Sequence, residues 1–326
     1  MNQFSKPPKT IPELISILEG KGIANANPSY SERVLQCIPY YKLSGYIKST
    51  PEPIELFDVI KTYELDMEIR NAIFGLLAHY EIALKNSFVN LTLQIDENHI
   101  RPYQKSHFYL SDKIFKHDVF NENLKRIEQD IEDNHPKLKF IDSYKSKYDN
   151  PKNPPIWMLT ELMSFGDICR WIKSINHQSY INIIPHKFGF KNVSEFNNVI
   201  MVCTNLRNMC AHHSRLWEND IYGKRVYLSS IPTIVKNTLR DNGQHKKLWN
   251  STVLVIYSLS KIGYKGDIKS FINLLCNIFE DYSTKHHGYG FPDSWKIKLE
   301  NIIKETQLED SEKNRYVTTL TNINIG

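Results

Sequence analysis

Apolar residues recur at three- and four-residue spacing along most of the chain, which is the repeat of an amphipathic α-helix. The longest such run extends from Ile54 to about Leu93 and predicts one long helix or two abutting helices. Only Arg225 to Leu228 hints at a strand, and weakly. We therefore expect an all-α protein. The same spacing predicts further helices at Tyr30–Cys37, Ile156–Ile175, Ser194–Arg215, Leu248–Ile262 and Ile268–Phe279.

Breaks between the helical runs predict how the chain is divided. Thr10 is placed to cap a first helix that stops at Gly20, and Pro51 ends an N-terminal helical arm, residues 1–50. Residues 51–262 are interpreted as a helical core, and residues 263–326 as a C-terminal helical extension. Within the core, the stretch from about 96 to 154 is rich in Lys, Asp, Asn and His and is interpreted as an insertion with short helices. Gly166 predicts a kink or a close helix contact inside its helix.

Composition narrows the class of protein without giving a function. The 326 residues are 41% hydrophobic, which is enough for a packed core. The formal net charge of +5 favours an anionic partner only weakly, because 41 basic residues are nearly balanced by 36 acidic ones. Five scattered cysteines without a Cys-x-x-Cys pair indicate reduced thiols. A polar N-terminus and the lack of a long apolar run argue against secretion and membrane insertion, so we expect a cytoplasmic protein.

The segment from Arg207 to His212 carries the candidate chemistry. On a helix, Asn208 and His212 lie on one face because they are four residues apart, whereas Arg207 and His212 diverge by roughly 140°. Metal-independent RNA cleavage needs a group that exchanges a proton near neutral pH and a cation for the developing phosphorane charge. His212 and Arg207 supply these two groups, and Asn208 can orient the phosphate or the imidazole. The alternative is a polar helix end, in which these cations, with His213 and Arg215, face the negative helix terminus.

Residues near this segment also have two interpretations each. His213 and Arg215 either contact phosphate or have a structural role in packing with Trp217. Glu81 and Lys85 are spaced for an intrahelical ion pair, and a place beside the active centre is the alternative.

Aromatic residues of the arm and residue types that bind metals are two further candidates for function. Tyr40, Tyr41 and Tyr46 either stack on bases or pack the arm onto the core. Cys203 and Cys210 lack the spacing of a zinc motif, so we expect no metal and no cofactor. The pair His286-His287 is interpreted as part of a solvated loop.

Several segments, in the same order along the chain, resemble the Abi-like family of bacterial phage-abortive-infection proteins, the AbiD and AbiF group. They fall within about residues 6 to 220, and the region after Leu228 matches no pattern of the family. The segments that carry the resemblance are Tyr40–Tyr46, Tyr63–Asp66, Ile69–Arg70, Tyr80–Lys85, Pro155–Trp157, Phe165–Gly166 and Leu206–Trp217.

The Abi-like family is a member of the HEPN superfamily, and the resemblance therefore implies a HEPN-like helical bundle. These proteins often dimerise and cleave RNA without metal through an Arg-x4–6-His motif. By resemblance, Arg207 and His212 take the catalytic places and Asn208 the polar position, with His213, Arg215 and Lys85 in support.

The function implied by this resemblance is that of an endoribonuclease toxin. It would attack through the 2′-hydroxyl at a composite homodimer site, leave a 2′,3′-cyclic phosphate and stop growth on phage infection. Its partners would be substrate RNA and an antitoxin, which can be a small RNA. A non-catalytic RNA-binding or sensing module, and a structural protein-interaction module, are the competing interpretations.

Overall fold

The computed structural model describes residues 7–50, 52–92, 114–134, 138–149, 154–221, 228–229, 231–240, 246–264, 266–282 and 285–306. Within these residues every regular element is a helix, and the only β-type pairings are two isolated bridges, Ala24 with Glu55 and Phe115 with Ile175. The prediction of an all-α fold is therefore confirmed. Among the described helices, none combines the length and apolar character that a membrane span needs.

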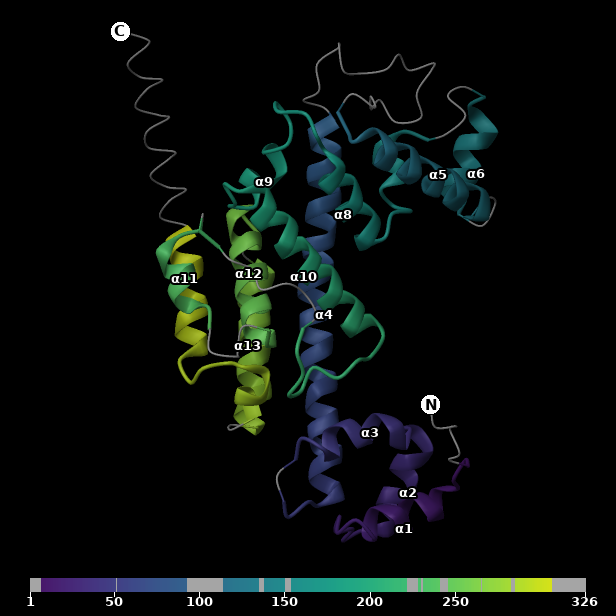
Figure 1. Ribbon diagram of the computed structural model, residues 1–326, viewed down its shortest axis with the longest axis vertical. Coiled ribbons are helices and arrows are strands. Elements are labelled where there is room, and N and C mark those ends of the chain that lie inside the picture. Colours follow the sequence, from purple (N-terminus) through teal and green to yellow (C-terminus); the bar gives the residue numbers. More distant parts are fainter. Residues whose placement is uncertain are drawn as a thin grey trace, which may run out of the picture.

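The long helix α4, Leu56–Thr92, is the central element of the fold. Its 37 residues form one continuous helix of about 55 Å rather than two abutting ones. It runs through the length of the molecule, with α1 to α3 near one end and α5 and α6 near the other (Figure 1). Buried residues at helical spacing hold it in the core: Leu65, Ile69, Ile73, Leu76, Leu77, Tyr80, Leu84 and Phe88.

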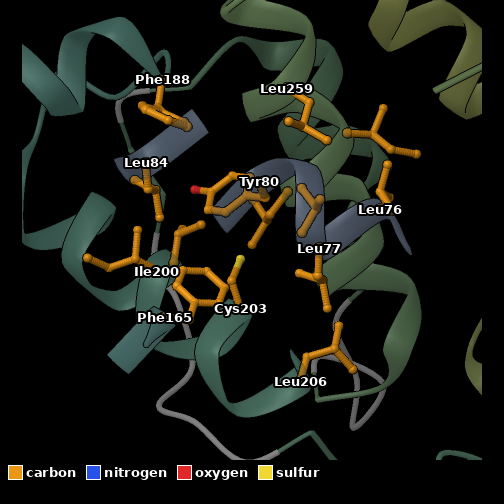
Figure 2. Packing of buried hydrophobic residues seen from close by; sticks show 14 of the residues in the cluster. Leu76, Leu77, Tyr80, Leu84, Phe165, Phe188, Ile200, Cys203, Leu206 and Leu259 are labelled. Carbon is orange, nitrogen blue, oxygen red and sulfur yellow. The ribbon is translucent and has the colours of Figure 1, made fainter. Parts of the chain in front are cut away.

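Four helices pack around α4 to form the main core: α8 (Phe165–Ser174), α10 (Val193–Ala211), α12 (Leu248–Lys261) and α13 (Gly266–Asp281). Tyr80 of α4 lies in the centre of this core, surrounded by Phe165, Ile200, Cys203 and Leu259 from the other helices (Figure 2). Short helices complete the bundle: α9 (Ile183–Lys187), α11 (Thr233–Thr238), the 3-10 helix η1 (Lys285–Tyr289) and a helix over residues 295–306.

The N-terminal helices have a hydrophobic cluster of their own. The helices α1 (Ile11–Glu19), α2 (Pro28–Cys37) and α3 (Tyr40–Ile47) pack on the first turns of α4. Thr10 caps α1 as predicted, and its backbone N–H donates to Glu13 Oε2 at 2.7 Å in a capping box. The buried side chains of the N-terminal cluster are Leu18, Ile23, Leu35, Leu43, Tyr46, Leu56, Val59 and Ile60.

The predicted division of the chain into parts at residues 50 and 262 stays a prediction.

The stretch interpreted as an insertion is helical where it is described. It forms α5 (His117–Asn134) and α6 (Lys139–Lys147), while residues 96–113 lie outside the described residues. Phe120 of α5 packs edge-on against Trp171 of α8 at 5.7 Å, which attaches this part to the core. The weak strand prediction also falls outside the described residues, except for Leu228.

The prediction of one helix from Ile156 to Ile175 was wrong. The structure has α7 (Ile156–Leu159), a turn, and then α8, which begins after Ser164. Ser164 Oγ accepts from the Asp167 backbone N–H at 3.2 Å, and Asp167 accepts in return from the Ser164 N–H at 3.0 Å. This capping box starts a new helix. Gly166 lies in the first turn of α8, so it kinks no helix.

Candidate functional site

The candidate motif occupies the last turn of α10 and the residue that caps it. Leu206, Met209 and Cys210 are buried and fix this turn to the core. The intervening side chains lie on the outside: Asn208 and His212 are exposed, and Arg207 is partly exposed. Alternation of buried and exposed positions therefore presents the polar groups to solvent on a turn that is held by its apolar neighbours.

The helix ends at Ala211, and not at Arg215 as predicted, because the chain reverses at His213. His213 has φ 54°, in the left-handed region, and its N–H donates to Cys210 O at 3.1 Å. Ser214 N–H donates to Met209 O at 2.8 Å, which completes a Schellman motif. Glycine is usual at this left-handed position, so a histidine there stores backbone strain. His212 is the C-cap residue, with its own N–H bonded to Asn208 O at 2.9 Å.

Asn208 and His212 lie on one open cavity of about 320 Å³. Its other lining residues are Asn205, Met209 and Ser214. An imidazole and a carboxamide therefore face the same space, as their spacing predicts. Arg207 Nη1 donates to Asn208 Oδ1 at 3.4 Å, but Arg207 is not among the described residues that line this cavity. One chain therefore brings Arg207 to Asn208 but not to the space that His212 faces.

Arg207 points instead toward α4. Its Nε lies 3.4 Å from Glu81 Oε2, an ion-pair distance without the geometry of a hydrogen bond. Glu81 Oε1 also contacts Lys85 Nζ at 3.2 Å, and the Arg207 guanidinium lies 5.9 Å from the Phe74 ring centre. The predicted Glu81–Lys85 ion pair is confirmed, and it lies beside Arg207. Two cations share one carboxylate here, which leaves a net positive charge for an anion.

The segment after the motif is fixed by a buried carboxylate, Asp66 of α4. Asp66 is fully buried and accepts from the Leu216 N–H at 3.1 Å and from the Trp217 N–H at 2.8 Å. Tyr46 Oη donates to the same carboxylate at 2.6 Å. Arg70, also buried, pairs with Asp66 and donates to Ser214 O at 3.4 Å. We call Tyr46, Asp66, Arg70 and the bonded backbone of residues 214–217 the Asp66 network.

Asp66 and Arg70 stand in segments that carry the family resemblance, but their sequence positions alone predicted no role for them. An available signal was their i, i+4 spacing on the same face as Leu65 and Ile69. Opposite charges on an apolar helix face indicate a buried pair, since unpaired charges there are very unfavourable. Burial, together with the charge of Asp66, raises the pKa of the Tyr46 phenol, so this hydroxyl stays a hydrogen-bond donor.

Arg215 anchors the segment to the N-terminal arm. Its Nη1 donates to Gly45 O at 2.9 Å and to Ser49 Oγ at 3.1 Å, and its guanidinium lies 5.9 Å from the Tyr46 ring centre. Lys42 Nζ adds a hydrogen bond to His213 O at 3.0 Å. These contacts give Arg215 a structural place, although with α3 rather than with Trp217.

The aromatic residues of the arm differ in their surroundings. Tyr46 is buried and packs the arm onto the core, whereas Tyr41 is 87% exposed.

The cysteines of α10, Cys203 and Cys210, are buried. Burial raises the pKa of the Cys203 thiol and raises that of the Cys210 thiol to about 12. Both are therefore protonated thiols at neutral pH.

The C-terminal part of the chain contacts the same segment from the other side. The ring centres of Trp217 and Tyr289 lie 5.4 Å apart in an edge-on arrangement, and Glu218 N–H donates to Gly288 O at 3.0 Å. A Cβ on Gly288 would lie 2.3 Å from the Trp217 ring, so this approach requires glycine. The interpretation of His286-His287 as a solvated loop was wrong for His286, which is buried in η1.

The candidate motif lies inside a stretch of the chain that matches a known protein family. Residues 33–218, more than half of the chain, match the model of the family described as Abi-like protein. The matched range includes the Asp66 network and the whole candidate motif. Searches of curated proteins and of solved structures found no match. The family match confirms the resemblance predicted from the sequence.

Proposed function

The chain belongs to the Abi-like protein family, which indicates a role in abortive infection, and from that premise we propose that it is a HEPN-type endoribonuclease. The observation that carries the proposal is the shared cavity of Asn208 and His212 at the end of α10, with Arg207 on the adjacent face. These side chains provide a titratable imidazole, a neutral hydrogen-bonding group and a permanent cation.

The chemistry follows from these three groups. The imidazole of His212 removes the proton from a ribose 2′-hydroxyl, and the 2′-oxygen attacks the adjacent phosphorus. The bond from phosphorus to the 5′-oxygen breaks, and a protonated imidazole returns a proton to that oxygen. Arg207 neutralises the phosphorane, and Asn208 orients the phosphate. The products are a 2′,3′-cyclic phosphate and a 5′-hydroxyl, and no step uses a metal.

We propose that the complete site forms between two copies of the chain, because Arg207 and His212 of one chain face different spaces. An exposed apolar stripe on α4 supports this arrangement. Met67, Phe74 and Ile82 are 41%, 39% and 63% exposed, and their spacing puts them on one side of the helix. The Phe74 ring centre lies 5.9 Å from the Arg207 guanidinium, so a two-fold contact through this stripe would bring the second copy to the motif.

The main test compares RNA cleavage by the wild type with that by His212→Ala, in buffer that contains a chelator. We expect His212→Ala to lower the cleavage rate by about 10²–10⁴-fold, and wild-type products to end in 2′,3′-cyclic phosphate. His186→Ala is the matched control, since His186 is an exposed histidine on α9. Undiminished cleavage by His212→Ala, or cleavage only with added divalent metal, would contradict the proposal.

Mixing two inactive variants tests the composite site. An Arg207→Ala chain and a His212→Ala chain restore one arginine and one histidine, from different copies, when they pair. We expect part of the activity to return on mixing, and neither variant to recover alone. Recovery should require a dimer in light scattering, and no recovery in a mixed dimer would place the whole site in one chain.

A non-catalytic RNA-binding module is the second candidate, favoured by the ion pair that holds Arg207 against Glu81. The two candidates differ in one measurement. If the wild type and Arg207→Ala both bind RNA and neither cleaves it, the chain is a binding module.

A further inference from the structure

The histidine pair of η1 forms a compact cluster with Asp293. His286 Nε2 and His287 Nε2 each lie 3.2 Å from Asp293 Oδ1, and the centres of the two imidazole rings are 4.0 Å apart. One ligand atom from each residue lies within 4.8 Å of the other two. Three residues that commonly bind metal thus converge within eight positions of the chain.

The distances in this cluster suit a tetrahedral metal ion. Zinc binds imidazole nitrogen and carboxylate oxygen at about 2.0–2.2 Å, so two ligand atoms on one tetrahedron edge are about 3.3–3.6 Å apart. The two separations of 3.2 Å between imidazole nitrogen and carboxylate oxygen are only slightly shorter than that edge. A single hydrogen bond has a similar length, but here one carboxylate oxygen faces two imidazole nitrogens at once.

The backbone that carries the cluster is held by the core. Tyr289 and Phe291 are fully buried, and the His286 ring packs against Phe279 at 5.8 Å. Gly290 N–H donates to His287 O at 2.8 Å, which keeps the turn between the ligands closed. Ligands on such a constrained turn lose little conformational entropy when a metal binds.

The cluster also has an entry path from solvent. The side chains of His287 and Asp293 are 54% and 86% exposed, whereas that of His286 is 11% exposed. A cation can therefore arrive from water and keep a water molecule as its fourth ligand. Two imidazoles with one carboxylate favour zinc over magnesium or calcium, which prefer all-oxygen sites.

We propose that His286, His287 and Asp293 bind one zinc-class divalent cation. This departs from the expectation, made from the sequence, that the chain holds no metal. The cation cross-links η1 to the turn before the helix over residues 295–306. Gly288 and Tyr289 of η1 contact Glu218 and Trp217, which follow the motif. The bound cation therefore stabilises these contacts between η1 and the segment after the motif.

The test uses the full chain stripped of metal with a chelator and then dialysed against Zn²⁺ at increasing concentrations. We expect one zinc ion per chain and a rise of several degrees in the melting temperature. Bound Co²⁺ should give a visible ligand-field spectrum without a thiolate charge-transfer band, which separates this cluster from the cysteines. No saturable zinc uptake by the wild type would overturn the proposal.

Two variants assign the binding to the cluster. His287→Ala and Asp293→Asn alter exposed side chains, so both should fold, as checked by circular dichroism. Each should weaken zinc binding by more than the roughly 10–100-fold that loss of an outer-shell partner causes, and should abolish the rise in melting temperature. His186→Ala should bind zinc like the wild type. Equal uptake by all four proteins would place the zinc elsewhere and overturn the proposal.

This test is independent of the proposed ribonuclease function. Zinc uptake and melting temperature are measured without RNA, and cleavage is measured in chelator. A failure of either result therefore leaves the other unaffected.

Discussion

Two neighbouring stretches at the end of α10 are held in opposite ways. Asn208 and His212 are exposed and line an open cavity, whereas the backbone of Leu216 and Trp217 is bonded to a buried carboxylate. Asn208 Oδ1 accepts a hydrogen bond from Arg207 Nη1 at 3.4 Å, within the motif itself. The buried side chains of Leu206, Met209 and Cys210 hold the turn that carries them. The segment that follows is held separately by three parts of the chain: α3, α4 and η1. The residues suited to act on a substrate are therefore different from the residues that hold the neighbouring backbone in position.

The largest effect on the positioning side is expected from Asp66→Asn. The amide leaves the buried Arg70 without its counter-charge and cannot accept every donor that Asp66 accepts. We expect the free energy of unfolding to fall by about 3–5 kcal/mol, measured by urea denaturation. Glu68→Gln, an exposed carboxylate on the same helix, should change it by less than about 0.5 kcal/mol. Equal effects of the two variants would show that the Asp66 network does not position this segment.

A smaller effect is expected from Arg215→Ala, which removes two hydrogen bonds to the N-terminal arm. Hydrogen bonds from a charged donor contribute about 1.5–3 kcal/mol, so the arm should open more often. Amide hydrogen exchange should become faster in α3 and stay unchanged in α10. Arg33→Ala, an exposed arginine on α2, is the control. Faster exchange in α10 as well would mean that Arg215 holds the motif helix itself.

The smallest effect, and the only stabilising one, is expected from His213→Gly. Glycine relieves the left-handed backbone at φ 54° and should raise the free energy of unfolding by about 0.5–1 kcal/mol. His213→Ala keeps the strained backbone and should not stabilise the fold. If RNA cleavage survives His213→Gly, His213 acts through its backbone, whereas loss of cleavage would assign a role to its imidazole.

The helices that form the core were predictable because their apolar residues follow the helical repeat closely. The α4 run and the α12 run, Leu248–Lys261, are examples. The break at Ser164 was missed because the apolar pattern continues across it, although Ser164 and Asp167 have the spacing of a capping box. The end of α10 was less accessible, since a histidine at φ 54° replaces the glycine that usually marks such a turn.

The candidate site was predictable only in part. Helical geometry gave the shared face of Asn208 and His212 and the divergence of Arg207. It gave no contact between residues distant in sequence, such as Asp66 with Trp217 or Arg215 with Gly45. These depend on tertiary packing, which periodicity along one element does not encode. The roles of Arg207, Asn208 and His212 in catalysis, and of His213, Arg215 and Lys85 in RNA contact, stay predictions.

The burial of Asp66 also limits how the chain can be shortened. Tyr46, from the N-terminal part of the chain, donates a hydrogen bond to this carboxylate. Tyr289, from the C-terminal part, lies close enough that burial and the charge of Asp66 raise the pKa of its phenol. A fragment that kept only the family-matched residues 33–218 would lack Tyr289 and Gly288, and would expose the Trp217 ring that they cover. The smallest fragment expected to preserve the motif therefore extends well beyond the segment that the family shares.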